Sequence, residues 1–307
     1  MRITRLGQTA AALGLALAAA MCSNSPSGPS NPGGGGAGGG GGGGNSSGTT
    51  VVMLAAGDIG MCGSPGVEQT ARLVAGLEGD VLLAGDIAYL QGTAANFRDC
   101  FNPFWGQFRS RWHPVPGNHE YESPGAAPYF AYFGEAAGPP GLGYYAFRAG
   151  EWLVLMLNSN IAATQGSPQW EFARGELERQ RTPCTMAVWH HPLFSSGPNG
   201  SNPPMRDMWA LLEANRVEVI VNGHDHLYER FARQMSDGRE DPVNGIRQFT
   251  IGTGGAELYN FVRAARNSEE RIMKFGVGRF TMAPAQLTWE FLGVDGSVGD
   301  RGLDTCR

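Results

Sequence analysis

The chain has 307 residues, which permits one large domain or two small ones. Hydrophobic residues make up 42% of the sequence, enough for a full core. The net charge is −5 and no run of Lys or Arg is present. These features argue against nucleic acid as a general partner, since such a partner normally requires a basic face.

Residues 1–22 are typical of an export signal. Two arginines precede an apolar stretch at residues 10–21, which is too short to span a bilayer. Cys22 follows at once and resembles a bacterial lipoprotein cleavage site, although Met21 stands where a small residue is usual. We expect a periplasmic, cell-surface or extracellular protein. A lipid on Cys22 that tethers the chain to a membrane is one of two alternatives, and cleavage without a lipid is the other.

Residues 23–48 contain Ser, Pro and Asn and then almost only Gly. Such a segment cannot bury apolar surface, so the composition predicts a disordered tether, with a low-complexity insert of no function as the alternative. The folded domain is expected to cover residues 49–307.

The folded part opens with a strand–helix–strand pattern. A continuous apolar run at residues 51–56 predicts a strand buried on both faces, residues 66–77 have helical spacing, and residues 81–84 predict a second buried strand. This order implies parallel pairing with a right-handed crossover. Residues 96–108 predict another helix and residues 113–116 a short strand.

In the remainder of the chain, predicted strands first alternate with predicted helices, and the last part is rich in strands. A hairpin is predicted at residues 144–147 and 152–157, on either side of an Ala-Gly pair. Helices are predicted at residues 167–180, capped by Ser167, and at 205–214, and strands at 186–189, 217–221, 247–251, 278–282 and 286–292. The pattern indicates one α/β domain with two mixed β-sheets packed as a sandwich and flanked by helices.

Five short stretches follow predicted strands and place an oxygen or imidazole ligand beside a turn-forming residue. The candidate ligands are Asp58, Asp86, Tyr89, Asn118, His190, His224 and His226. Ligands collect at strand ends in α/β sheets, because the loops there project from a rigid base. Each stretch alone is compatible with an ordinary turn. Their joint order predicts a site for two adjacent metal ions.

Four cysteines remain beyond Cys22, and an exported protein can pair them. Cys62 follows the first ligand stretch and Cys100 lies soon after the second, so we favour a Cys62–Cys100 bridge. Cys184 would then pair with Cys306. Three pairings are formally open, and free buried thiols are the alternative.

The order of the five stretches resembles the calcineurin-like metallophosphoesterase superfamily, and more narrowly its purple acid phosphatase branch, over residues 51–289. Two motifs indicate the branch: Gly-Asp-x-x-Tyr at residues 85–89 and Gly-His-x-His-x-Tyr-Glu-Arg at residues 223–230. Most of the superfamily has a histidine two positions after the first aspartate. Gly60 stands there in this chain, and Tyr89 takes the place of that histidine. The implied fold is a four-layer αββα arrangement.

The resemblance implies two metal sites that share Asp86. One metal would be held by Asp58, Asp86, Tyr89 and His226, and the other by Asp86, Asn118, His190 and His224. A free tyrosine has a pKa of about 10, so it binds only a strongly acidic metal that displaces its proton. Fe³⁺ is therefore expected at the first site, and Zn²⁺, Mn²⁺ or Fe²⁺ at the second.

The implied activity is that of an acid phosphatase-like, metal-dependent phosphoric ester hydrolase. A metal-bound hydroxide would attack a small phosphate monoester. His119 is implied as the proton donor to the leaving group, and His191 as a contact to phosphate or a residue that orients a ligand.

Four neighbouring residues are interpreted as supporting or packing residues. Asp225 is expected to support an imidazole, Tyr228 to line the pocket, and Glu229 and Arg230 to form a structural ion pair. His113, inside a predicted strand, is interpreted as a packed histidine.

Other functions remain open at the sequence level. A phosphodiesterase or nucleotide-cleaving enzyme could use the same centre, and residues 123–143 and 195–204 give no readable substrate code. A tethered metal-binding module without turnover, and a plain adhesion domain, are the non-enzyme alternatives.

Overall fold

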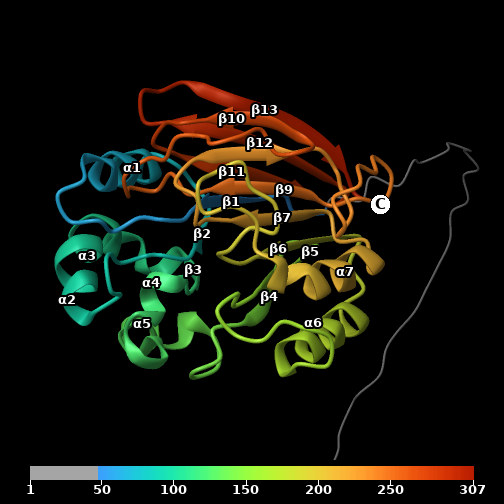
Figure 1. The fold of residues 1–307 in the computed structure, drawn as a ribbon, viewed down its shortest axis with the longest axis horizontal. Coiled ribbons are helices and arrows are strands. Elements are labelled where there is room, and N and C mark those ends of the chain that lie inside the picture. The colour runs from blue at the N-terminus through green and yellow to red at the C-terminus, as the bar shows by residue number, and fades with distance from the viewer. Residues whose placement is uncertain (1–47) are drawn as a thin grey trace, which may run out of the picture. The chain divides into compact units, whose positions relative to one another are not determined.

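The computed structural model describes residues 48–307 (Figure 1). The predicted export signal, Cys22 and nearly all of the predicted tether lie outside the described residues. Within residues 48–307, no helix combines the length and apolar character that crossing a membrane requires.

The first sheet has six strands in the order β13-β12-β11-β1-β2-β3. Their bounds are β1 Val51–Ala56, β2 Asp80–Ala84, β3 Trp112–Val115, β11 Gly276–Ala283, β12 Gln286–Gly293 and β13 Val298–Thr305. The strands β1, β2 and β3 are parallel, as the predicted crossover requires, and β11 to β13 are antiparallel to their neighbours.

The second sheet has seven strands in the order β10-β8-β9-β7-β6-β5-β4. Their bounds are β4 Tyr145–Ala149, β5 Trp152–Met156, β6 Cys184–Val188, β7 Val219–Asn222, β8 Tyr228–Phe231, β9 Arg247–Ile251 and β10 Ser268–Ile272. The strands β5, β6, β7 and β9 are parallel, and β4·β5 forms the predicted hairpin.

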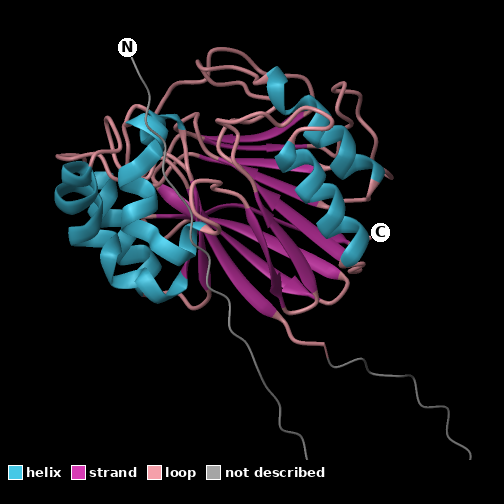
Figure 2. Cartoon of the chain, turned by 90° about the horizontal axis from the view of Figure 1, so that it is seen from below, coloured by secondary structure: helices cyan, strands magenta, loops and turns pink. Residues whose placement is uncertain are grey.

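Helices cover the outer faces of both sheets (Figure 2). The longer helices are α1 Pro65–Ala75, α6 Pro168–Arg179 and α7 Arg206–Ala214, and the shorter ones are α2 Ala94–Asn96, α3 Asn102–Trp105, α4 Asn118–Tyr121 and α5 Ala127–Phe133. Buried side chains form one apolar layer between the sheets and one beneath each group of helices. The predicted sandwich of two mixed sheets with flanking helices is thereby confirmed.

Some predicted elements differ in extent. Residues 96–108 do not form one helix, because the backbone passes through a π-turn at Phe97–Phe101, the short α3 and a 3-10 segment at Gly106–Arg111. Pro103 lacks the amide proton that a continuous helix would use there. The strands β8, β10 and β13 were missed. β8 has only four residues, and β10 and β13 are edge strands rich in charged residues and glycine, which is typical of protected edges.

The expected roles of three residues on β8 were wrong. Tyr228 is buried between the sheets and its Oη donates to Asp300 at 2.7 Å, so it does not line a pocket. Glu229 and Arg230 do not pair with each other, because successive side chains on a strand point to opposite faces. Glu229 accepts from the Ser196 amide at 2.9 Å, and the Arg230 Nε donates to Asp300 at 2.7 Å.

Two disulfides have the favoured pairing. Cys62–Cys100 joins the loop after β1 to the turn between α2 and α3, and Cys184–Cys306 joins β6 to the residues after β13. The second bridge therefore links the two sheets.

Asp300 on β13 provides a first prediction. Its carboxylate accepts from Tyr228 and Arg230 at 2.7 Å each and from Trp289 Nε1 at 3.1 Å. Burial raises the pKa of Asp300, but hydrogen bonds from Arg230 and Tyr228 outweigh burial and hold it below its ordinary value. The stability it contributes is present above the unfolded carboxyl pKa of about 4 and is lost as pH falls through the folded pKa.

Asp300→Asn is expected to lower the free energy of unfolding at neutral pH by about 1–3 kcal/mol, the cost of weakening hydrogen bonds to a buried charge. Urea denaturation measures the loss, which should shrink below pH ~4. The control is Asp295→Asn, which removes an exposed carboxylate paired with Lys274. Equal stability of the Asp300 variant and the wild type at neutral pH would contradict this role.

Candidate metal centre

The candidate ligands lie in five segments at the carboxyl ends of β1, β2, β3, β6 and β7. All are in loops except Asn118, which is the first residue of α4. Hydrogen bonds connect these loops directly. The Asp58 amide donates to Gly85 O at 3.0 Å, the His224 amide donates to Asp58 Oδ2 at 2.8 Å, and the Gly223 amide donates to His190 O at 3.0 Å. The loops therefore form one connected rim across both sheets.

Tyr89 lies at the centre of the first group of donor atoms. Its Oη is 2.8 Å from Asp58 Oδ1, 3.2 Å from Asp86 Oδ2 and 2.9 Å from His226 Nε2. The Nδ1 of His226 donates to Glu257 O at 2.6 Å, so in the neutral ring its Nε2 carries a lone pair. Three acceptors thus surround a hydroxyl that has a single proton. A cation would satisfy the atoms that this proton cannot.

His190 lies at the centre of the second group. Its Nδ1 donates to Ala84 O at 2.8 Å, and its Nε2 faces Asp86 Oδ2 at 3.0 Å and Asn118 Oδ1 at 3.2 Å. The His224 ring lies 5.1 Å from the His190 ring, centroid to centroid. Acceptors that face one another require a shared proton or a metal ion, so this half also fits a cation.

Charge in the site is concentrated on buried carboxylates. Burial raises the pKa of Asp86, but the His190 imidazole beside it outweighs burial and lowers it. Burial lowers the pKa of His190, and the Asp86 carboxylate raises it to about 9. Burial, Asp58 and Asp86 raise the pKa of Tyr89 well above its ordinary value. Metal ions would replace the protons on His190 and Tyr89.

The imidazoles of His191 and His224 behave differently from that of His190. Burial, followed by the charge on His190, lowers the pKa of His191 to about 3 and that of His224 to about 2. Both rings are therefore neutral near pH 7 and keep a lone pair for a ligand or a hydrogen bond.

Three glycines allow this close approach. A Cβ at Gly117 would lie 2.0 Å from Asp86 Oδ1, and one at Gly223 would lie 2.6 Å from Asp58 Oδ2. A Cβ at Gly60 would lie 2.5 Å from the carbonyl oxygen of Ile87, so the histidine usual at this position has no room. The donor atoms and the space around them fit a pair of metal ions.

His119 and His191 lie beside the donor atoms. The partly exposed His119 ring packs on Tyr89 with centroids 4.4 Å apart, its Nδ1 is bonded to Leu90 O, and its Nε2 is 3.8 Å from Asp86 Oδ2. His191 Nδ1 is 2.7 Å from Ser159 Oγ, and its ring lies 4.4 Å from that of His224. Both histidines therefore lie directly beside candidate metal ligands.

Asp225 does not support an imidazole as expected. Its carboxylate accepts from Ser195 Oγ and from the Asn199 amide at 3.0 Å, so it orders the 195–199 loop instead. The backbone of His224 is left-handed, with a φ of 74°. His113 is packed as predicted, with its ring stacked on Phe147 at 4.0 Å.

Glu120 is a residue whose role the sequence analysis missed. It is fully buried and accepts from the amides of Ile87 at 2.8 Å, Ala88 at 3.1 Å and Gly117 at 2.8 Å. It therefore joins the loop of Asp86 and Tyr89 to the loop of Asn118. Glu120 ends the stretch Gly-Asn-His-Glu at residues 117–120, which follows β3 directly. This position was the feature of the sequence that could have indicated its role.

Tyr259 was also missed. Its ring stacks on His226 with centroids 3.9 Å apart and an interplanar angle of 12°. It comes from a segment remote in sequence from every ligand stretch, so no local pattern pointed to it.

Comparison with known proteins assigns the family. A family profile described as "Calcineurin-like phosphoesterase" matches residues 52–228, more than half of the chain. The chain belongs to this family.

Within this family, the chain is similar to several purple acid phosphatases. Purple acid phosphatase 18 of Arabidopsis thaliana is 30% identical over 191 residues, which cover 57% of this chain and 43% of that protein. Probable purple acid phosphatase 20 of the same plant is 30% identical over 228 residues, covering 65% and 50%. The predicted resemblance to purple acid phosphatases is confirmed. The chain spans about half the length of the curated relatives it matches.

The fold has a solved counterpart. The structure of purple acid phosphatase PPD1 from yellow lupin (Lupinus luteus) seeds superposes with a TM-score of 0.73 at 20% identity, covering 84% of this chain and 54% of that one. At this identity the likeness concerns the fold.

Glu120→Gln tests the connection between the loops. The amide NH₂ cannot accept from a backbone N–H, so at least one of the three hydrogen bonds is lost. We expect lower metal content per chain, measured by plasma emission spectrometry, and a lower melting temperature by several degrees. Glu122→Gln changes an exposed neighbour and should alter neither. Full metal content in the Glu120 variant would contradict the positioning role.

Proposed function

We propose that this protein is an exported dinuclear-metal phosphatase that hydrolyses phosphate monoesters. Membership of the calcineurin-like phosphoesterase family and the likeness to purple acid phosphatases support this class. The observation that carries the narrower proposal is the Tyr89 hydroxyl, which lies 2.8–3.2 Å from oxygens of Asp58 and Asp86 and 2.9 Å from His226 Nε2.

Two metal sites follow from the donor atoms. Asp58, Asp86, Tyr89 and His226 would hold Fe³⁺, since a phenol releases its proton only to a strongly acidic ion. Asp86, Asn118, His190 and His224 would hold Zn²⁺, Mn²⁺ or Fe²⁺. Two carboxylates and a phenolate leave such a pair of ions with net positive charge, which suits a phosphate ester.

The metal pair, when bound, supplies an activated water and neutralises the phosphoryl oxygens. Two histidines of the chain would contact the leaving group and the phosphate. The His119 Nδ1 donates a hydrogen bond to Leu90 O, which fixes the ring. When the imidazole carries both protons, its Nε2 would give one to the leaving alkoxide. The Ser159 hydroxyl fixes His191 through Nδ1, which leaves its Nε2 for a phosphate oxygen.

Export is part of the proposal. The two disulfides support an oxidising compartment, because such bridges are rare in reducing ones. Cleavage before Cys22, with or without a lipid on that cysteine, concerns residues outside the described part of the chain.

Tyr89→Phe tests the ferric site. The purified wild type is expected to show a broad visible absorption band, because a phenolate bound to Fe³⁺ transfers charge to the metal. The band should disappear in Tyr89→Phe. Tyr121→Phe removes a hydroxyl that bonds Asn158 instead, and should keep the band. A colourless, iron-free but active wild type would refute the Fe³⁺–Tyr89 assignment and leave a broader phosphoesterase function.

The substrate class is tested with a matched pair of esters. We expect kcat/KM for nitrophenyl phosphate to exceed that for bis-nitrophenyl phosphate about tenfold or more, because the diester lacks one charged oxygen for the positive site. Predominant turnover of the diester would instead show a phosphodiesterase on the same centre.

A further inference from the structure

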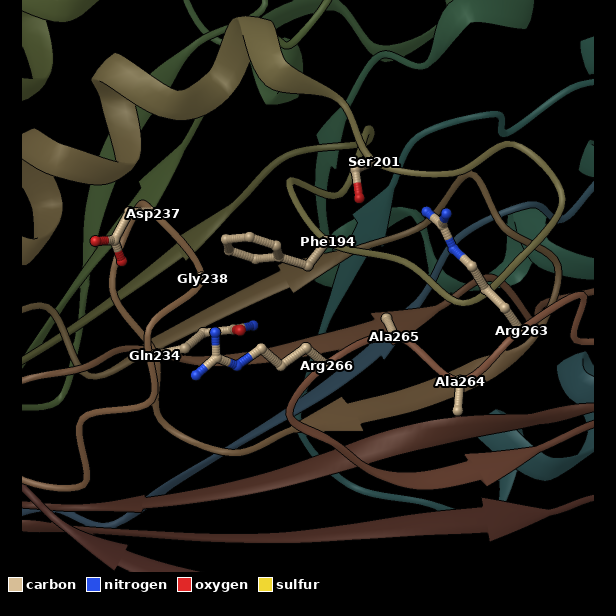
Figure 3. Close-up of a pocket in the computed structure, with 9 residues that line it drawn as sticks. All are labelled: Phe194, Ser201, Gln234, Asp237, Gly238, Arg263, Ala264, Ala265 and Arg266. Carbon is tan, nitrogen blue, oxygen red and sulfur yellow. The ribbon is translucent and has the colours of Figure 1, made fainter.

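A cavity of about 370 Å³ lies beside the loop that follows His191 (Figure 3). Its walls come from three segments: Phe194 and Ser201 of that loop, the turn at Gly238, and residues 263–266. None of the seven candidate metal ligands lines it. It is therefore a separate place where a small molecule could bind.

The cavity carries net positive charge in an acidic protein. Arg263 and Arg266 both line it and both are exposed, and among residues 48–307 neither forms an ion pair. Asp237 supplies the single carboxylate among the lining residues. By contrast, Arg230 and Arg247 both pair with Glu269. Two arginines without carboxylate partners favour an anion in the cavity.

Gln234 provides a second, independent observation. It lines the cavity and is fully buried, and its Oε1 accepts from Asn267 Nδ2 at 2.9 Å. Its Nε2 has no hydrogen-bond partner in the described part of the chain. A buried donor without a partner is unfavourable, and an anionic oxygen would satisfy it. Figure 3 shows the Arg266 side chain extending toward Gln234 and that of Arg263 toward Ser201.

The cavity and the candidate metal centre share a wall. Within the loop, the Asn199 Nδ2 donates to His224 O at 2.8 Å and its amide donates to Asp225 Oδ1 at 3.0 Å. The loop also contacts the arginine segment, because Ala265 N donates to Ser196 Oγ at 2.7 Å. A molecule in the cavity would thus touch the same loop that contacts the segment of His224 and His226.

We propose that this cavity is an oxyanion site for a phosphate group, held by Arg266 and the Gln234 Nε2, with Arg263 adding positive charge on the Ser201 side. The Phe194 ring provides an apolar wall for the organic part of a phosphorylated molecule. The group could be the distal phosphate of a substrate whose other phosphate lies at the metal centre, or free inorganic phosphate. The first source rests on the proposed function, and the second does not.

Equilibrium dialysis with radiolabelled inorganic phosphate tests the site in the metal-loaded, full-length protein. The wild type should bind one phosphate at the metal centre and a second in the cavity. The double variant Arg263→Gln/Arg266→Gln should weaken the second site about tenfold or more, because one charge-assisted contact and a second positive charge are lost. Arg301→Gln, an exposed arginine on β13, should keep both.

A second variant probes the buried amide. Gln234→Glu has nearly the same shape but replaces the free donor with an acceptor, so it should also weaken the cavity site about tenfold. Circular dichroism and thermal melting show whether the Gln234→Glu variant folds. If it does not fold, the double arginine variant still tests phosphate binding in the cavity. One bound phosphate in the wild type, or unchanged cavity binding in the folded variants, would overturn the proposal.

Two further measurements separate the cavity from the metal centre and decide the source. After chelation the cavity site should still bind phosphate, so a failure of the proposed function would leave this result unchanged. The kcat/KM ratio of an alkyl bisphosphate to its monophosphate should fall about tenfold in the double arginine variant if the cavity takes a distal phosphate. If the ratio is unchanged but the variant no longer binds phosphate in the cavity, the ligand of the cavity is free inorganic phosphate. Either outcome supports an oxyanion site.

Discussion

The buried carboxylate of Asp86 lies between the two halves of the donor set. One of its oxygens is 3.0 Å from His190 Nε2 and 3.2 Å from the Tyr89 hydroxyl, and the other accepts from the His119 amide at 2.9 Å. A carboxylate removed from water in this way is unfavourable unless positive charge and hydrogen bonds compensate. The site therefore depends on cations, and the arrangement of the loops around Asp86 follows from that requirement.

The rest of the fold holds the loops in position. The parallel strands of the first sheet end at Asp58, Asp86 and Asn118. Those of the second sheet end at His190 and His224, at the same end of the sandwich. Glu120 then joins two of these loops through three backbone amides. Gly117 and Gly223 allow backbone to approach the carboxylates more closely than a side chain would permit. Rigid strands and small residues together place donors within ångströms of one another.

Local patterns in the sequence predicted the buried central strands, the crossover and the ligand stretches, because apolar runs and strand-end turns are local signals. The edge strands β10 and β13 escaped prediction, since charged residues and glycine hide a strand's periodicity. Glu229 and Asp225 were assigned wrong partners because their contacts, Ser196 and Ser195, are remote in sequence. The stacking of Tyr259 on His226, and a Gln234 Nε2 without a hydrogen-bond partner among residues 48–307, likewise exist only in the folded chain.

We propose that the seven candidate ligands hold two different metal ions that share Asp86. Anomalous diffraction from crystals of the purified protein, recorded on both sides of the iron absorption edge, locates the ions and identifies iron. We expect two peaks beside Asp86, with the iron peak on the side of Tyr89 and His226. A single metal peak, or a peak near Tyr89 that does not respond to the iron edge, would contradict it.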